Sequence, residues 1–142
     1  MTIARILSVK GRDVVTIQPH RLVHEAVTLL AERRIGAVVV AGADGKVLGI
    51  LSERDIVRAL AKGAGTLQDP VSRYMTPKVV TCTVDTLVVD AMEEMTNGRF
   101  RHLPVVEGGK LAGIISIGDV VKHRLAEIQH ETEALREYIT AG

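Results

Sequence analysis

The sequence contains one pattern twice, and this internal repeat restricts the fold more than any other feature. Both halves contain the order Gly-Ile-x-Ser-x-x-Asp, once at residues 49–55 and once at 113–119. The copies lie 64 residues apart there and 65 residues apart upstream, where Val15-Thr16 returns as Val80-Thr81, because one residue is lost in a turn. The lead-ins match as well, with Ile3, Ile6 and Leu7 corresponding to Val71, Tyr74 and Met75. Such a chain is expected to form two copies of one unit that cover each other's apolar surface.

Each copy alternates strand-like and helix-like segments. The β-branched residues 14–17 and the apolar run 37–40 predict strands. Helical spacing of apolar residues begins at Leu22 in the first half and at Leu87 in the second. Residues 43–46 predict a hairpin turn, residues 47–51 the returning strand, and Ser52 the start of a helix through about Leu60. Each repeat is therefore predicted to be β-α-β-β-α, with the first strand of the second repeat at Val80-Thr81.

These elements predict an α/β (α+β) fold of two tandem β-α-β-β-α repeats, packed by pseudo-twofold symmetry and followed by a C-terminal helix. We expect the first repeat at residues 1–62, a linker at 63–70, the second repeat at 71–124 and an amphipathic C-terminal helix at 125–142. The linker is small, polar and ends at Pro70, which is typical of a connection between packed units.

Composition excludes several classes of protein. Apolar residues make up 46% of the chain but aromatic residues only 2%, so the core is expected to be aliphatic. A net charge of +1 argues against a nucleic-acid-binding protein, and no apolar run approaches the 18 residues of a membrane span. The single cysteine, Cys82, excludes an internal disulfide and is expected in the core. No metal requirement is predicted, and we expect a protein of the cytoplasm.

The repeated Ser-x-x-Asp pattern has two interpretations. A Ser at a helix start can accept a hydrogen bond from a first-turn amide while the acid reaches back, which makes a capping box. The acid here is Asp, which is short for that reciprocal contact, and each copy follows a strand that starts with glycine. A helix N-terminus offers free N–H groups to a phosphate, and a carboxylate accepts hydrogen bonds from ribose hydroxyls. The second interpretation therefore predicts a nucleotide site.

The chain resembles a tandem pair of CBS domains, the so-called Bateman module. The resemblance depends on both Gly-Ile-x-Ser-x-x-Asp patterns, on Met75-Thr76-Pro77, on residues 101–106 and on the Gly-Lys turns, and it covers nearly all of residues 1–124. It implies a regulatory module without enzymatic activity that binds an adenosine-containing ligand. AMP is the first expectation, with ADP, ATP, NAD(H) and S-adenosylmethionine as alternatives.

In the resembled family each site is composite, taking the Ser-x-x-Asp pattern of one repeat and the first two strands of the other. The resemblance places the first composite site at Ile50, Ser52, Arg54, Asp55, Lys78, Val80, Arg101, His102 and Pro104. It places the second composite site at Ile114, Ser116, Asp119, Asp13, Val15, Gly36, Ala37 and Val38.

The two composite sites differ in charge. Arg101-His102 stands opposite Gly36-Ala37 in the repeat, and Arg54 stands opposite Gly118. Arginine binds phosphate through a planar fork with a charge that does not titrate, and His102 adds a donor that depends on pH near neutrality. The first site is therefore expected to hold the phosphate-rich ligand, while the second has almost no cation and is expected to be empty or to hold a nucleoside.

The expected function is that of a ligand sensor that passes its state to an unidentified partner protein. The resemblance also implies a homodimer formed through the helices of the repeats. A ligand-free dimeric scaffold is the alternative, in which the Ser-x-x-Asp patterns serve as helix caps alone. The C-terminal segment carries an apolar seam at Leu125, Ile128, Thr132, Leu135 and Ile139. This spacing of three and four residues predicts docking on a partner subunit or on the N-terminal helix of the same chain.

Overall fold

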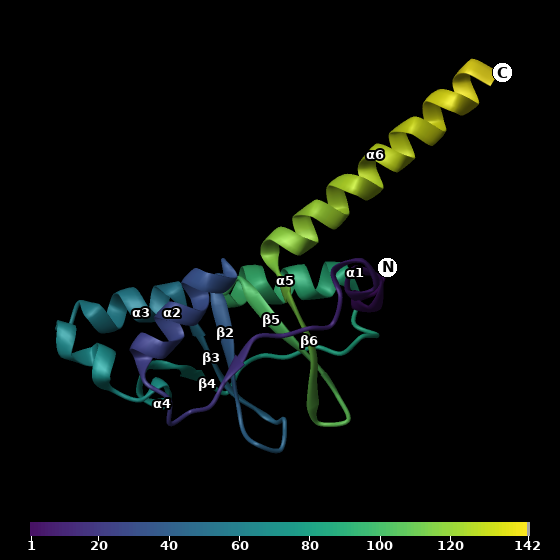
Figure 1. The fold of residues 1–142 in the computed structure, drawn as a ribbon. Helices are drawn as coiled ribbons and strands as arrows, with labels where there is room; N and C mark the ends of the chain where they lie inside the picture. The colour runs from purple at the N-terminus through teal and green to yellow at the C-terminus, as the bar shows by residue number, and fades with distance from the viewer. Residues whose placement is uncertain (142) are drawn as a thin grey trace.

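The computed structural model describes residues 1–141 and shows two repeats in one body with a long terminal helix (Figure 1). The first repeat comprises α1 (Ile3–Lys10), β1 (Thr16–Ile17), α2 (Val23–Arg33), β2 (Ala37–Ala41), β3 (Val47–Ser52) and α3 (Glu53–Leu60). The linker carries a short 3-10 helix, η1 (Ala64–Gln68). The second repeat comprises α4 (Val71–Tyr74), β4 (Thr76–Pro77), α5 (Val88–Gly98), β5 (His102–Glu107), β6 (Lys110–Ser116) and α6 (Ile117–Ala141). The predicted α/β fold class is confirmed.

The first sheet has the strand order β1-β2-β3-β4. β1 runs parallel to β2, and β2 pairs antiparallel with β3 through the hairpin that the sequence predicts. All five residues of β2 are buried. Because side chains alternate between the faces of a strand, both faces of this sheet must be covered.

The first strand of the second repeat differs from the prediction. Val80-Thr81 forms no strand, and the segment reaches β5 only at Cys82, which is bridged in parallel to Val105. The reason lies just upstream, where Thr76–Pro77 pairs antiparallel with β3 of the first repeat. The residues that follow connect one sheet to the other, so few of them remain to pair with β5.

The two lead-in helices are exchanged between the repeats. Ile3, Ile6 and Leu7 of α1 pack into the core of the second repeat, with Met95, Leu103 and Ile115. Conversely, Val71 of α4 packs into the core of the first repeat, and Tyr74 and Met75 lie against it. Each repeat thus completes the core of the other, which is why the body is one folding unit. The reciprocal exchange is the relation expected of a pseudo-twofold pair.

The glycine that opens each Gly-Ile-x-Ser-x-x-Asp pattern makes room for the exchanged lead-in. A Cβ atom on Gly49 would lie 2.7 Å from Met75 Sδ and 2.8 Å from the Thr76 carbonyl oxygen. A Cβ atom on Gly113 would lie 3.0 Å from the two methyl carbons of Leu7. At Gly49 the added atom would clash with the backbone of Thr76 as well as with a side chain. At Gly113 it would contact only the end of the Leu7 side chain, which can change its rotamer.

We expect Gly49→Ala to destabilise the protein more than Gly113→Ala. The added methyl at residue 49 forces β4 away from β3, and overpacking of this kind costs about 1–3 kcal/mol. At residue 113 a shift of Leu7 relieves the contact. Chemical denaturation of both variants measures the two free energies of unfolding, and equal losses would contradict this account.

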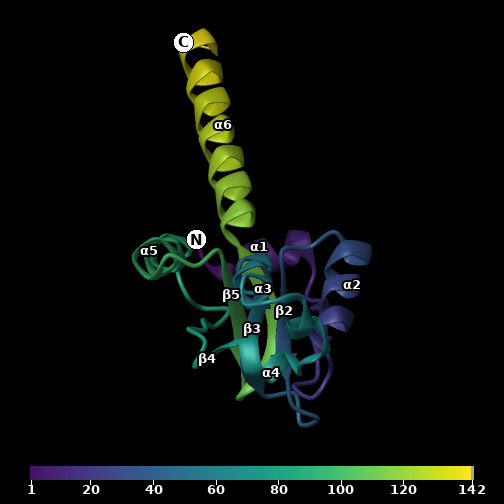
Figure 2. The same ribbon diagram turned by 90° about the vertical axis from the view of Figure 1, so that its left-hand side faces the viewer.

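α6 is a single helix that leaves the body at one end, and most of its length lies beyond every other element (Figures 1 and 2). Among its residues only Val120, near its start, is buried. Of the helices in the described part of the chain, none combines the length and the apolar character needed to cross a membrane.

Candidate functional site

Both Ser-x-x-Asp patterns sit at the starts of helices and form capping boxes. At α3, Asp55 N donates to Ser52 Oγ over 3.3 Å, and Ser52 N donates to Asp55 Oδ2 over 2.9 Å. At α6, Asp119 N donates to Ser116 Oγ over 3.1 Å, and Ser116 N donates to Asp119 Oδ2 over 2.8 Å. The expectation that Asp is too short for the reciprocal contact is therefore wrong.

Capping leaves part of each pattern available for a ligand. Only Oδ2 of Asp55 and Asp119 accepts a hydrogen bond among the described residues, and no buried side-chain oxygen there lacks a partner. Oδ1 of each carboxylate is therefore in contact with solvent. At the helix starts, Glu53 N donates to the Gly36 carbonyl and Ile117 N to the Arg101 carbonyl. One accessible carboxylate oxygen thus remains at each helix start.

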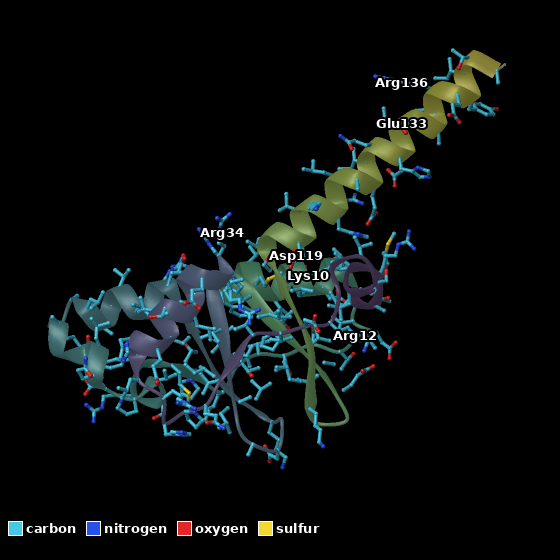
Figure 3. The ribbon with its side chains drawn as sticks, viewed as in Figure 1. Lys10, Arg12, Arg34, Asp119, Glu133 and Arg136 are labelled. Carbon is cyan, nitrogen blue, oxygen red and sulfur yellow. The ribbon has the colours of Figure 1, made fainter. Side chains whose placement is uncertain are left out.

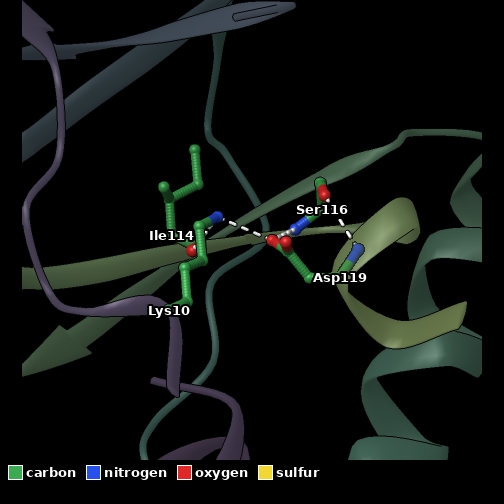
Figure 4. A network of polar contacts seen from close by, with 4 residues as sticks. All are labelled: Lys10, Ile114, Ser116 and Asp119. Atoms are coloured by element: carbon green, nitrogen blue, oxygen red, sulfur yellow. Dashed lines mark hydrogen bonds and ion pairs between the residues drawn. The ribbon is translucent and has the colours of Figure 1, made fainter. Parts of the chain in front are cut away.

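The second composite site already holds a cation of the same chain. Lys10, the last residue of α1, donates through Nζ to Asp119 Oδ2 over 2.6 Å and to the Ile114 carbonyl over 2.9 Å (Figure 4). Burial alone would raise the pKa of the Asp119 carboxyl, but the hydrogen bonds from Lys10 and Ser116 and the Lys10 charge outweigh it, so this pKa is lowered. The Lys10 ammonium group therefore binds the Asp119 carboxylate and the Ile114 carbonyl, two residues that the resemblance assigns to ligand binding.

The expectation that the second site has almost no cation is therefore wrong. The internal repeat contains the signal that was missed. The lead-ins match at an offset of 68 residues, which sets Lys10 opposite Lys78, a residue already assigned to the first site. Among the ion pairs of the described residues, Lys10 is joined to Asp119, but Lys78 is not joined to Asp55. The two sites differ because one carboxylate is covered and the other is open.

The residues predicted for the first composite site come from both repeats, which meet where β4 pairs with β3. Ile50 pairs antiparallel with Thr76, so Lys78 lies two residues beyond this pair, on the side of Leu48 and away from the start of α3. From the first turn of α3, Arg54 reaches the second repeat and donates to the Arg99 carbonyl over 3.5 Å. Lys78, Arg54 and Arg101 are all exposed. The structure therefore offers solvent-facing cations from both repeats, of which Arg54 lies in the first turn of α3.

His102 lies between the two helix starts. A Cβ atom built on Gly36 would lie 3.5 Å from the His102 ring and 3.8 Å from Glu53 Oε2. Burial and the positive charge of Lys10 lower the pKa of His102, while Asp119 and Glu53 act in the opposite direction. The pKa of His102 therefore lies below the ordinary value of histidine, and the site favours the neutral ring over the charged one.

We expect the protein to lose stability as the pH falls below about 6.5, in part through His102. Because the pKa of the folded state is lowered, the unfolded chain binds a proton that the folded chain refuses, and this favours unfolding. Melting temperatures at pH 7.5 and 5.5 measure the effect, which His102→Gln should reduce. His130→Gln, on the exposed part of α6, is the matched control and should leave the difference unchanged.

The remaining predicted residues lie in the strands or in the irregular segments before them. Ala37, Val38 and Pro104 are buried, and the Pro104 carbonyl accepts a hydrogen bond from Cys82 N. Val15 is half-buried and its carbonyl accepts from Val39 N, whereas Asp13 and Val80 are exposed. The buried side chains among them cannot touch a ligand, so they act through backbone groups or not at all.

Two hollows mark the surface of the described residues. One of about 390 Å³ is lined by β1 and a face of α2, and it contains no predicted site residue. The other, of about 230 Å³, is lined by Asp55, Arg58, Ala59, Lys62, Arg73 and Tyr74. Three cations beside Asp55 were missed from the sequence, although Arg58 and Lys62 follow it at helical spacing. Neither hollow is lined by β5 or β6, so neither coincides with a composite site as predicted.

The CBS domain family model matches this chain twice, at residues 7–62 and 71–126. A crystal structure of the CBS-domain containing protein ATU1752 from Agrobacterium tumefaciens is 54% identical, with a TM-score of 0.85, over 87% of this chain and 99% of that chain. The CBS domain protein PAE2072 from Pyrobaculum aerophilum, solved in complex with AMP, is 29% identical, with a TM-score of 0.75, over 84% of this chain and 89% of that chain.

Curated relatives vary more in length. A 17.7 kDa protein of Acidianus ambivalens is 37% identical over 119 residues, which are 83% of this chain and 71% of that protein. The chain spans 61% of the mitochondrial CBS domain-containing protein CBSX3 of Arabidopsis thaliana and 22% of the longer CBSCBSPB5. The two-repeat unit therefore occurs both with little else and as part of larger chains.

Proposed function

The chain belongs to the CBS domain family as a tandem pair, and we propose that it is a regulatory protein that binds an adenosine-containing ligand between its repeats. AMP is the first candidate, and ADP, ATP, NAD(H) and S-adenosylmethionine are the others. The protein has no catalytic role in this proposal, and the bound ligand biases the arrangement of the two repeats.

One observation carries the proposal. Asp55 keeps a solvent-accessible Oδ1 at the start of α3, next to the place where β4 of the second repeat crosses Ile50. A carboxylate oxygen there is suited to the two hydroxyls of a ribose. Capping and ligand binding then use different oxygens of one carboxylate, so the capping box does not exclude the ligand.

The surrounding charges favour a ligand with a phosphate. Arg54 is exposed in the first turn of α3, Lys78 and Arg101 are exposed in the second repeat, and guanidinium groups bind phosphate oxygens in pairs. The complex of PAE2072 with AMP is the relevant precedent among the relatives, at 29% identity. The first composite site is therefore proposed as the principal site, while Lys10 covers the second.

The route from ligand to partner is proposed to run from the first site through the contact between the repeats to α6. Arg54, next to Asp55, donates to the Arg99 carbonyl of the second repeat, so a ligand at the first site would act on the arrangement of the two repeats. A ligand shifts such an equilibrium only through unequal affinity for the two arrangements. The repeat helices are proposed to form a homodimer.

Calorimetric titration with AMP, ATP, NADH and S-adenosylmethionine tests the proposal. We expect saturable binding of at least one ligand, and stabilisation of about 2.7 kcal/mol at a hundredfold excess over the dissociation constant. The 2′-deoxy form of the best ligand should bind more weakly, because Asp55 then lacks a hydroxyl donor. Inorganic phosphate controls for unspecific attraction to the cations. If none of the adenosine ligands binds, the proposal is rejected.

A ligand-free dimeric scaffold is the second candidate, and one observation favours it. Both Ser-x-x-Asp patterns close capping boxes. In that case Asp55→Ala and Asp119→Ala would lower the melting temperature, and no nucleotide would raise it. The same titrations therefore separate the two candidates.

A further inference from the structure

The part of α6 that leaves the body carries an uncovered apolar seam. Its large apolar residues are 44% to 68% exposed, namely Val121, Leu125, Ile128, Leu135 and Ile139. Their separations of four and three residues, with Thr132 filling the remaining position, follow the heptad pattern of a coiled coil. Of the two predicted docking surfaces, the N-terminal helix of the same chain leaves this seam uncovered.

The seam faces away from the body of its own chain. Val120 is buried, and the side chains of His123 and Glu127 are only 15% and 22% exposed. His123 Nε2 lies 3.1 Å from Met1 Sδ, so this face of α6 rests on the N-terminal region. At 3.6 residues per turn, Leu125 lies on the far side of the helix, roughly 140° from Val120, and Ile128 lies at roughly 80°, on the flank of that side. Another helix therefore has free access to the seam.

The residues that flank the seam indicate which helix fits. With Leu125 and Thr132 at a positions, Glu131 falls at a g position and Arg136 at the e position five residues later. In a parallel pair, a residue at a g position lies next to the following e position of the other helix. Glu131 of each chain therefore lies next to Arg136 of the other chain, which gives two ion pairs. The other such pair joins Arg124 of one helix to Gln129 of the other, and it adds no charge repulsion because Gln129 is neutral. Neither Glu131 nor Arg136 has an ion-pair partner within residues 1–141, and Arg136 extends into open space (Figure 3).

The antiparallel arrangement is disfavoured by the same charges. Overlapping the two seams head to tail sets Leu125 against Leu135 and Ile128 against Thr132. The flanking positions then bring Lys122 next to Arg136 and Glu131 next to its own copy, and both pairs repel. The seam is also narrow, because charged or polar residues occupy most e and g positions. A narrow a/d stripe suits two strands, since bundles of more strands bury those positions.

We propose that α6 forms a parallel, two-stranded coiled coil with α6 of a second copy of this chain. The helices begin at the two bodies and run side by side, with Leu135 and Ile139 near the tip. This interface is separate from the repeat helices through which dimerisation was expected, and it does not depend on ligand binding. About two heptads alone make a weak pair, so the interface would form together with contacts between the bodies.

Disulfide cross-linking of the full chain tests the proposal. Ile139→Cys places a thiol in the seam, and Glu137→Cys places one on the outer side of the same helix as the matched control. Burial raises the pKa of Cys82 to about 11, so this native thiol reacts little at pH 8. In a parallel pair the two thiols at residue 139 face each other at an effective concentration of millimolar order. Oxidation with copper phenanthroline at micromolar protein should then link Ile139→Cys at least tenfold faster than Glu137→Cys.

Reversing the charge at residue 136 distinguishes a parallel from an antiparallel pair of α6 helices. Arg136→Glu turns two attractive pairs into repulsive ones in the parallel arrangement, which weakens the pair roughly five- to tenfold and slows cross-linking at residue 139. Adding Glu131→Arg restores the attraction and the rate. In an antiparallel pair Arg136→Glu would instead meet Lys122 and strengthen association. All of these substitutions lie on exposed helix positions, so circular dichroism should show an unchanged fold.

Three results would overturn the proposal. Equal rates for Ile139→Cys and Glu137→Cys would mean that a different protein, or none, covers the seam. Rapid cross-linking between Val121→Cys and Ile139→Cys chains, with none between two Ile139→Cys chains, would indicate an antiparallel pair. A trimer or tetramer that disappears with Leu135→Asp, seen by sedimentation, would exclude two strands.

Discussion

Asp55→Asn is expected to lower the affinity for AMP roughly 10- to 100-fold, because hydrogen bonds to a charged group contribute about 1.5–3 kcal/mol. The amide keeps one oxygen that can accept from Ser52 N, so the capping contact at the start of α3 survives in part. What is lost is the negative charge and the second acceptor oxygen that face the ribose. Calorimetry gives the affinity, and thermal denaturation confirms that the variant is folded.

Asp119→Asn is the matched control for this experiment. It makes the same chemical change in the corresponding capping box of α6, but at a carboxylate that Lys10 already covers. We expect the affinity of the first site to change by less than about twofold, since the two sites use different carboxylates. Asp55→Ala is less informative, because it also removes the cap and costs about 1 kcal/mol of stability. If Asp55→Asn binds AMP as tightly as the unaltered chain, the carboxylate is a cap alone.

Periodicity and repetition predicted most of the fold. The hairpin between β2 and β3, the start of α3 at Ser52 and its end at Leu60 follow from local signals. The exchange of α1 and α4 between the cores could not be read from such signals. Apolar positions such as Ile3 and Val71 show that a side chain is buried, but they do not show which repeat buries it.

Local sequence signals predict the contacts of the candidate site even less well than those of the core. The Ser-x-x-Asp pattern is compatible with a cap and with a ligand site, and only coordinates show that Oδ2 is used while Oδ1 is open. The contact of Lys10 with Asp119 spans 109 residues, so no window of the sequence contains both partners. The internal repeat was the one signal that reaches this far. Applied to the lead-ins, it would have placed Lys10 opposite Lys78.

Removal of the Lys10 side-chain charge is expected to open the second site. In the folded chain the Lys10 ammonium lies 2.6 Å from Asp119 Oδ2 and 2.9 Å from the Ile114 carbonyl oxygen. A nucleoside would need the same carboxylate for its ribose, so it competes with a cation that is part of the chain. We expect Lys10→Met to bind two equivalents of AMP or adenosine where the unaltered chain binds one, as measured by calorimetric stoichiometry.

Arg12→Met is the control that separates this competition from a general loosening of the segment after α1. Arg12 also joins the two repeats, through an ion pair of 3.0 Å with Glu107, but both side chains are about half exposed and neither belongs to the second site. Its loss should leave the stoichiometry at one, and so should Lys78→Met, which alters the first site instead. A second equivalent that appears with Arg12→Met as well would mean that mobility of the segment governs the site. One equivalent in all three variants would show that Lys10 fills a position that no ligand takes.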